Sequence, residues 1–290
     1  MGKKKQKVLP LVSICTPTFN RRPFIQNMFE CFRNQDYPKS KMEWIIVDDG
    51  TDKIKDLVED ISAVKIKYVE LEEKVSLGKK RNMLHKESTG EILIYIDDDD
   101  YYPPERVHHA VTELIQSKKL IAGSSRLYIW FQEEGVWQFG PYGPNHATAG
   151  TFAFKRELLN STNYEEDASF AEEKKFLHNY TIPLIQLDPF KTMLVFNHAH
   201  NTINKRSFIA NPSKYVKKTD YDVTKFIKNE QAQQFYTDEL HKLLLNYEEG
   251  EAKNKPDLLK ALAERNLLNK ERTQAQIRSN ENKIIITVLL

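Results

Sequence analysis

The sequence has few cysteines and no long apolar run, and each shortage removes a class of protein. Two cysteines, Cys15 and Cys31, occur in 290 residues, so we expect buried thiols rather than a disulfide framework or a zinc site. No apolar stretch reaches the ~20 residues that a membrane-spanning helix requires. Because no signal-peptide pattern is visible either, we expect a soluble protein of a reducing compartment, most simply the cytoplasm.

Net charge is also nearly absent, because 43 lysines and arginines almost balance 41 aspartates and glutamates. With a net charge of +2, no global field attracts nucleic acid, and we expect no nucleic-acid partner. Two terminal features stand apart: a basic tip, Lys3 to Lys7, and an apolar tail, Ile284 to Leu290. We interpret the tip as a solvated leader and the tail as an added strand or a partner contact. Peripheral contact with a membrane surface is the alternative for both.

Short apolar runs alternate with helical patterns along most of the chain. Strands are predicted at 11–16, 44–47, 66–69 and 92–96, with helices near 23–33, 54–61, 76–90 and from Pro104 onward. This alternation is typical of an α/β fold with a mainly parallel sheet flanked by helices. Short β-like runs follow from about residue 120, and the pattern turns helical past about residue 211. We therefore predict a catalytic domain over residues 1–210 and a helical C-terminal extension over 211–290.

Four consecutive aspartates, residues 97–100, follow the apolar run at 92–96. Adjacent carboxylates repel one another, and they persist most easily where a cation or solvent screens them. Ligands of open α/β sheets bind beyond the carboxyl ends of strands, which is where this cluster falls. Oxygen ligands suit Mg²⁺ or Mn²⁺, and these ions suit phosphate oxygens. We predict a metal and diphosphate site, with a solvated acidic turn as the alternative.

Six motifs occur in the order found in the family 2 glycosyltransferases with the GT-A fold, which the chain resembles over about residues 8–205. In chain order they are Pro17-Thr18-Phe19-Asn20-Arg21, residues 47–51, residues 78–82, Asp97-Asp98-Asp99, residues 171–173 and residues 198–202. The resemblance implies a Rossmann-like α/β domain, a nucleotide-sugar donor and a divalent cation, Mn²⁺ or Mg²⁺. It also implies a glycan or glycoconjugate acceptor and inversion at the sugar carbon.

The resemblance assigns the metal to the Asp-X-Asp motif and the closing histidine motif. Asp99 is the preferred candidate for the metal ligand, and Asp97 is expected to contact the ribose or the water shell of the metal. His198 and His200 lie two apart, so on an extended segment both face the same way. One of them could complete the metal shell or bind the diphosphate. Motif spacing favours His198, and a solvated histidine is the alternative for each.

The resemblance assigns the donor nucleotide to the first three motifs. Asp48 is expected to accept a hydrogen bond from a uracil-type N–H, with a turn or cap residue as the alternative. Phe19 is expected to pack on the base, and Arg81 to contact the base or the phosphates. The other donor-binding residues implied are Pro17, Thr18, Asn20 and Asp98. Residues 145–146 stand in a stretch that resembles the acceptor-side loop.

Two adjacent glutamates compete for the role of catalytic base. Ser169-Phe170-Ala171-Glu172 fits a capping box, in which Glu172 would have the structural task of binding the N-cap amide. Glu173 points about 100° further around the helix and has no such local partner. It also takes the second place of the family's Glu-Asp pair, which carries the base. We predict Glu173 as the base, with Glu172 as the competing candidate.

The chain departs from the family in two ways. A glutamate replaces the usual aspartate base, and the family's Gln/Arg-X-X-Arg-Trp processive motif is absent. This absence argues for transfer of single sugars and against a membrane-embedded polysaccharide synthase. A sugar-nucleotide pyrophosphorylase is an alternative function, but it requires a glycine-rich loop where residues 16–21 contain no glycine. A sugar-nucleotide-binding protein without turnover is another, and the intact carboxylates argue against it.

Overall fold

The computed structural model describes residues 9–267 except 170, 202 and 204, together with residues 271 and 274. The chain divides into two compact units, the first ending at Glu251 and the second beginning at Ala252. The second unit contains a 3₁₀ turn, Ala252–Asn254, and a helix over residues 256–267. The basic tip and the apolar tail lie outside the described residues. Within the described part of the chain, every helix is too short or too polar to cross a membrane.

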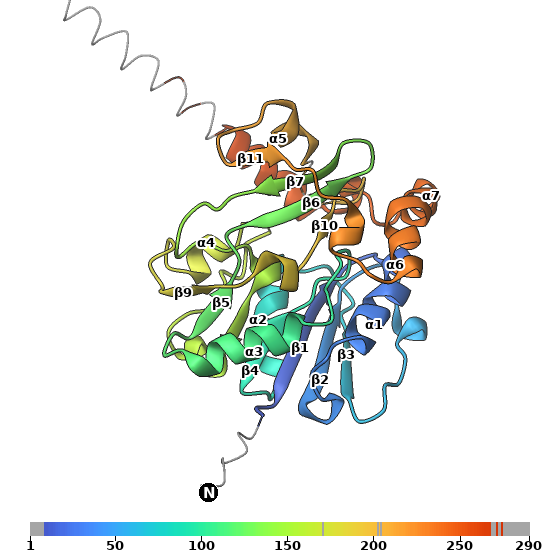
Figure 1. Ribbon diagram of the computed structural model, residues 1–290. Coiled ribbons are helices and arrows are strands. Elements are labelled where there is room, and N and C mark those ends of the chain that lie inside the picture. Colours follow the sequence, from blue (N-terminus) through green and yellow to red (C-terminus); the bar gives the residue numbers. More distant parts are fainter. Residues whose placement is uncertain are drawn as a thin grey trace, which may run out of the picture. The chain divides into compact units, whose positions relative to one another are not determined.

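A seven-stranded sheet forms the centre of the first unit, in the order β3-β2-β1-β4-β8-β5-β9 (Figure 1). Strands β1 to β4 are parallel, β8 runs antiparallel to both of its neighbours, and β9 is parallel to β5. The predicted mainly parallel sheet is therefore confirmed. The strands are β1 Val12–Thr18, β2 Met42–Asp48, β3 Lys65–Glu70, β4 Ile92–Tyr95, β5 Ile121–Gly123, β8 Ala153–Lys155 and β9 Leu184–Gln186.

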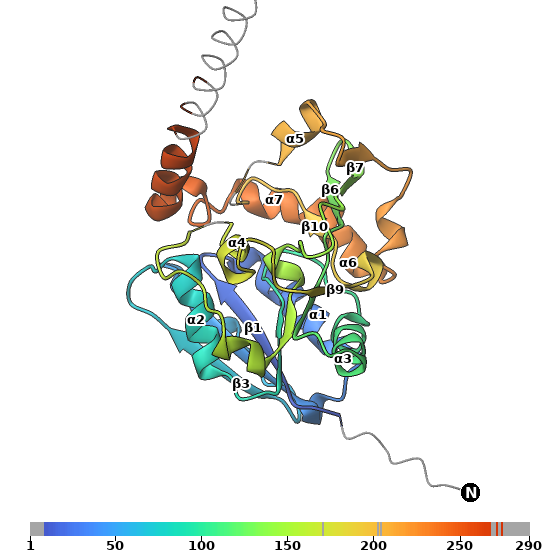
Figure 2. The ribbon, with the colours of Figure 1, turned by 90° about the vertical axis from the view of Figure 1, so that its left-hand side faces the viewer.

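Helices cover both faces of this sheet, as Figures 1 and 2 show. Side chains alternate along a strand, so Trp44 and Ile46 enter one core while Ile45 and Val47 enter the other. The first core is completed by α1 (Ile25–Arg33) and α3 (Arg106–Gln116), and the second by α2 (Leu77–Glu87) and α4 (Glu173–Phe176). Burial on both faces explains why these strands read as continuous apolar runs.

The helix predicted near residues 54–61 is wrong. The structure has a single 3₁₀ turn, Lys55–Leu57, in this stretch. Four apolar positions at helical spacing are a weak signal over so short a length. In the structure the chain here is irregular, and the side chains of Leu57, Val58 and Ile61 still pack against the core.

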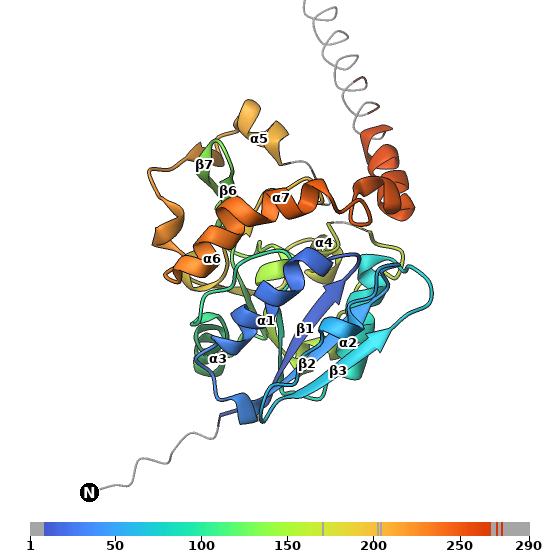
Figure 3. The same cartoon turned by 90° about the vertical axis from the view of Figure 1, so that its right-hand side faces the viewer.

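A second sheet and the segment after residue 210 complete the first unit. The strands of this second sheet, in spatial order, are β10 Val195–Phe196, β6 Leu127–Phe131, β7 Gly135–Phe139 and β11 Val216–Lys218. After α5 (Arg206–Ala210) come α6 (Glu230–Gln234), a π-helix (Phe235–Glu239) and α7 (Leu240–Leu245), which lie beside α1 in Figure 3. Because β11 pairs with β7 and Phe235, Tyr236 and Leu240 enter the core, the compact unit extends past the boundary predicted at residue 210.

Candidate active site

The loops after β1, β2 and β4 meet at one edge of the sheet, because these strands are parallel neighbours. Thr18, the last residue of β1, pairs with Asp48, the last residue of β2. Strand β4 pairs with β1 up to Tyr95 and runs into the four aspartates directly afterwards. The three loops therefore converge beyond the carboxyl ends of these strands, where the aspartate cluster was predicted to form a ligand site.

Arg21 lies within the aspartate cluster. Its Nε is 3.4 Å from Asp98 Oδ1 and its Nη2 is 3.2 Å from Asp99 Oδ2. Burial raises the pKa of Asp98 to about 7, although Arg21 opposes this rise. Asp99 is half-buried, and although burial alone would raise its pKa, Arg21 and His198 together hold that pKa below the usual range. The protein thus supplies a cation of its own that screens the adjacent carboxylates, and Asp99 is the anionic member of the pair.

Asp99 and His198 form the part of the cluster best suited to a divalent ion. His198 Nε2 lies 3.2 Å from Asp99 Oδ2. Two neighbouring ligands of an octahedral Mg²⁺ with bonds of ~2.1 Å are roughly 3.0 Å apart, so the pair fits two positions of such a shell. Among the described residues, no group of three or more His, Cys, Asp or Glu side chains is arranged to hold a metal. The described residues thus supply two candidate ligands, Asp99 and His198.

Asp97 points to a different partner. Its Oδ1 lies 3.6 Å from Arg81 Nη1, and neither buried atom has a hydrogen-bond partner within the described part of the chain. Burial raises the pKa of Asp97, while Arg81 opposes this rise. Arg81 Nε donates to Glu172 Oε1 at 2.8 Å, and its guanidinium lies 4.3 Å from the Tyr95 ring centre. A buried donor and a buried acceptor thus face each other as an ion pair that no direct hydrogen bond closes.

The two histidines of the closing motif have different surroundings. His198 contacts Asp99, whereas the His200 ring lies 6.0 Å from the ring of Tyr247. A Cβ on Gly250 would come within 2.5 Å of His200 Nδ1, so that ring is held against the segment 247–250. The backbone oxygen of His200 accepts from Arg21 Nη2 at 3.1 Å. The geometry favours His198 over His200 as the metal ligand, which stays a prediction.

The carboxylate of Asp48 is occupied by its own loop. Its Oδ1 accepts from the Gly50 amide at 2.8 Å, and its Oδ2 accepts from the Ile54 amide at 3.1 Å and from the Tyr68 hydroxyl at 2.7 Å. Asp48 is fully buried. These contacts favour the alternative reading of Asp48 as a turn residue over a contact with the nucleotide base.

The neighbouring Asp49 and Lys80 form a buried ion pair that the sequence reasoning missed. Lys80 Nζ also donates to the backbone oxygen of Thr18 at 2.8 Å, and Asp49 Oδ2 accepts from the Val75 amide at 2.8 Å. The pair therefore ties the first three motifs together. A signal was present, since Lys80 stands in the third motif beside Arg81 and an ionised lysine is buried only with a partner.

The remaining residues of the first motif lie at the end of β1 and in the loop that follows it. Pro17 and Thr18 are buried at the end of β1, and the half-buried Phe19 has the ammonium groups of Lys74 and Lys80 at 5.0 and 5.8 Å from its ring centre. Asn20 adopts a left-handed backbone, with φ of 51°. Its side chain accepts from the Asp52 amide at 2.9 Å and donates to the backbone oxygen of Glu249 at 2.8 Å. The Asn20 side chain therefore links its own loop to the loop after β2 and to the segment around Glu249 by hydrogen bonds.

The capping box predicted at Ser169 is wrong, because α4 begins at Glu173 with Glu172 as its N-cap and without a side-chain cap. Ala171 has a left-handed backbone, with φ of 51°, which prevents the helix from starting earlier. Glu172 has a structural task of another kind, since it holds Arg81. Burial and the neighbouring Glu172 raise the pKa of Glu173 to about 7. A carboxylate with such a pKa can exchange a proton near neutral pH.

Comparison with known proteins places this geometry in a family. The family model "Glycosyl transferase family 2" matches residues 13–170. The poly(ribitol-phosphate) beta-N-acetylglucosaminyltransferase TarS of Staphylococcus aureus is 31% identical over 118 residues, which cover 37% of this chain and 21% of TarS. The chain thus corresponds to about a fifth of the length of that relative.

Solved structures share the fold. TarS residues 1–349 in complex with UDP-GlcNAc gives a TM-score of 0.52 at 21% identity, covering 64% of this chain and 58% of that one. The mannosyltransferase PcManGT of Pyrobaculum calidifontis, in complex with GDP-Man and Mn²⁺, gives 0.54 at 18% identity, covering 72% and 66%. With the family model spanning both the carboxylate cluster and the loops after β1 and β2, the chain belongs to glycosyl transferase family 2.

Proposed function

We propose that the protein transfers a single sugar from a nucleoside-diphosphate sugar, with UDP as the nucleotide, to a hydroxyl of a glycan or glycoconjugate, with inversion. The observation that carries the proposal is the chain of contacts from the aspartate cluster through Arg81 and Glu172 to the base candidate Glu173. It joins a site for diphosphate charge to a carboxylate that can take a proton. The complex of TarS with UDP-GlcNAc supports the donor class.

A divalent ion, Mn²⁺ or Mg²⁺, is part of this proposal. Asp99 and His198 would hold it, and their 3.2 Å separation is compatible with a shared ion. When bound, such an ion neutralises the charge that develops on a departing diphosphate. PcManGT, which shares the fold, was solved with GDP-Man and Mn²⁺. Arg21 adds a permanent positive charge to the same group of carboxylates.

Glu173 has the second task in the proposed reaction. As the acceptor oxygen attacks the sugar carbon, the bond from that carbon to the diphosphate breaks and the hydroxyl proton moves to the Glu173 carboxylate. A positioned base typically contributes ~10²–10⁴-fold to the rate. Arg81, held by Glu172 at 2.8 Å and facing Asp97, is placed to orient the donor next to this base.

A donor panel tests the function directly. UDP-, GDP- and dTDP-sugars are incubated with the protein, with Mn²⁺ and with EDTA, and both nucleotide release and thermal shift are measured. We expect a UDP-sugar with Mn²⁺ to give the largest shift and to release UDP when an acceptor is present. A shift without release under any condition would favour the binding protein without turnover. Formation of UTP from a UDP-sugar and pyrophosphate would favour the pyrophosphorylase.

A further inference from the structure

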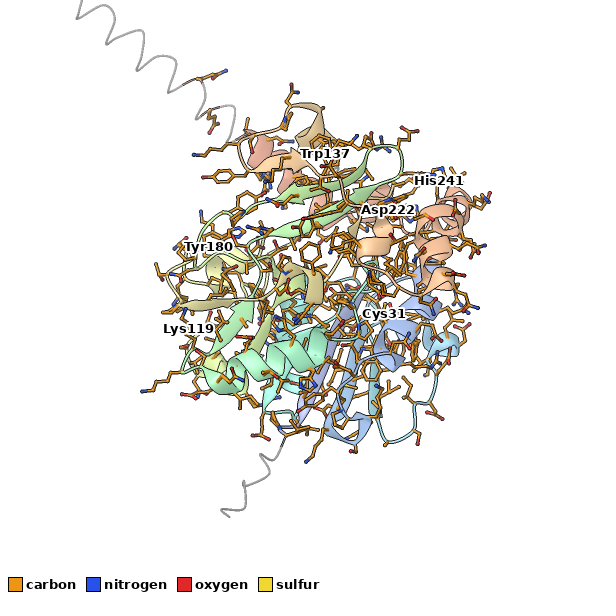
Figure 4. All side chains as sticks on the ribbon, in the orientation of Figure 1. Cys31, Lys119, Trp137, Tyr180, Asp222 and His241 are labelled. Atoms are coloured by element: carbon orange, nitrogen blue, oxygen red, sulfur yellow. The ribbon has the colours of Figure 1, made fainter. Side chains whose placement is uncertain are left out.

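The segment behind the base candidate has a strained backbone. Left-handed φ values of 49°, 56° and 63° occur at His178, Asn179 and Tyr180, just after Leu177, the C-cap of α4. Residues with a Cβ avoid this region, and successive ones persist where the surroundings determine them and function requires them. The result of the turn is the placement of Tyr180 beside α4, as Figure 4 shows. Tyr180 is near enough to Glu173 that burial together with this carboxylate raises the pKa of its phenol to about 12.

Tyr180 is the first of four rings in contact, which we call the aromatic row. The rings of Tyr180 and His146 stack with centres 4.8 Å apart, His146 and Tyr142 are 4.8 Å apart, and Tyr142 and Tyr215 are 5.3 Å apart. Tyr142 and Tyr215 are 41% and 37% exposed. The row therefore runs from the turn after α4, the helix that begins with Glu173, to the molecular surface, and its rings come from three separate segments of the chain.

The loop that carries Tyr142 and His146 is held firmly in place. Ser125 Oγ accepts from the amides of Tyr142 and Gly143 at 2.7 and 3.2 Å. Gln186 Nε2 donates to the backbone oxygens of Pro144 and His146, both at 2.9 Å. Polar side chains here serve to fix exposed rings, which is the preorganisation that a binding surface needs.

A pocket of about 520 Å³ adjoins Tyr142, the third ring of the row. Tyr142 and the prolines at positions 141, 144 and 189 line it, together with Ser124, Arg126, Gly143, Gln186 and Leu187. Arg126 is exposed and is the one charged residue among these lining residues. Within the described part of the chain, no carboxylate forms an ion pair with it. Its guanidinium is thus positioned for an anionic group on a ligand.

We propose that the aromatic row binds the sugar rings of the acceptor, and that the Arg126 pocket takes an anionic group carried by that acceptor. The C–H faces of a pyranose pack on aromatic rings, while its hydroxyls remain free to bind water or polar side chains. Its inner ring, Tyr180, follows the helix that begins with Glu173, where the attacking hydroxyl has to lie, so we assign the row to the acceptor rather than to the donor. This inference rests on the proposed function, and it names the acceptor class: a saccharide bearing phosphate or carboxylate.

Binding to defined saccharides tests the inference. The probes are a neutral trisaccharide and the same trisaccharide with a terminal phosphate, titrated into wild type, Tyr142→Ala, Arg126→Ala and Tyr221→Ala. Tyr221 is the matched control, because it is also 41% exposed but lies outside the row. We expect the phosphorylated probe to bind wild type more tightly, and Tyr142→Ala to lose about tenfold in affinity for both probes. Arg126→Ala should bind the neutral probe as wild type does and lose only the tighter binding of the phosphorylated probe. Tyr221→Ala should bind both probes with the affinity of wild type.

Four outcomes overturn the inference: no binding of either probe, equal binding of both, unchanged affinity in Tyr142→Ala, or an equal loss in Tyr221→Ala. The thermal shift with UDP and Mn²⁺ is measured on the same samples. If wild type shows no shift, the proposed function fails at the donor. If the shift is present in every variant while saccharide binding does not follow the row, the acceptor assignment alone fails.

Discussion

At the scale of single residues, neighbouring carboxyl groups of one type are set to different protonation states. Asp98 is buried and Asp99 half-buried, and both lie beside Arg21, yet burial raises the pKa of Asp98 to about 7 while Arg21 and His198 hold the pKa of Asp99 below its usual range. Like charges in contact separate their pKa values in this way. An anionic Asp99 is the form that a metal ion requires.

We expect Asp99→Asn to abolish sugar transfer and to remove the thermal shift that UDP with Mn²⁺ produces. Stability without ligands should change by about 1 kcal/mol or less, because Asp98 can ionise in its place and keep Arg21 paired. Thermal unfolding with and without UDP–Mn²⁺ measures both effects. A variant that keeps normal affinity for UDP–Mn²⁺ would contradict the metal assignment.

The glutamate pair predicts a pH dependence. Transfer needs an ionised base, so the rate should rise with pH through about 7, the pKa of Glu173.

Glu173→Gln should lose ~10²–10⁴-fold in rate while still binding UDP and metal. Glu172→Gln removes a like charge, so the acid limb of its profile should move to lower pH, and the loss of its Arg81 contact should raise KM for the donor. An inactive Glu172→Gln beside an active Glu173→Gln would reverse the two roles.

At the scale of elements, the parallel strands were predictable from the sequence, whereas the conformations and contacts of the loops between the elements were only partly predictable. Ile45 and Val47 on one face of β2, and Trp44 and Ile46 on the other, are all apolar, and this double burial is visible in the sequence. The start of α4 was not predictable, because Ala171 takes a left-handed conformation that its residue type disfavours. The side-chain contacts of Asp48 were also hidden, since Tyr68 reaches it from another strand.

The segment 247–250, which follows α7, is a second element whose role was invisible in the sequence. Tyr247 donates to Asp52 Oδ2 at 2.8 Å, the backbone oxygen of Glu249 accepts from Asn20 Nδ2 at 2.8 Å, and Gly250 lies against His200. These contacts come from a part of the chain far beyond the family motifs. The segment therefore holds two candidate donor loops and the closing histidine motif together.

We expect Gly250→Ala to weaken UDP–Mn²⁺ binding about tenfold while the protein stays folded. The new Cβ would lie 2.5 Å from His200 Nδ1 and 2.9 Å from the backbone oxygen of Asn20, so both residues must shift. Titration of UDP in the presence of Mn²⁺ measures the loss. Leu245→Ala is the control, since Leu245 is 69% exposed on the preceding helix, and an equal loss in that variant would count against a role for residue 250.

At the scale of the whole molecule, every candidate site residue named above lies in the first compact unit, which ends at Glu251. We expect deletion of residues 284–290 to leave donor hydrolysis and UDP affinity unchanged. Nucleotide release by the truncated and full chains provides the comparison. A truncated protein that stays folded but no longer binds the donor would show that the site depends on the second unit.

The Arg21 guanidinium also has a consequence for the order in which ligands arrive. Its Nη2 is 3.2 Å from the same Asp99 oxygen that faces His198, so the metal ion proposed for this site would have to compete with a counter-ion already in place. A nucleotide that brings its own phosphates offers Arg21 a new partner as it releases that oxygen. The protein without ligands should therefore bind free divalent cations weakly and take up the metal ion together with the nucleotide. The complex of donor and ion, rather than the ion alone, would then be the ligand that the site selects.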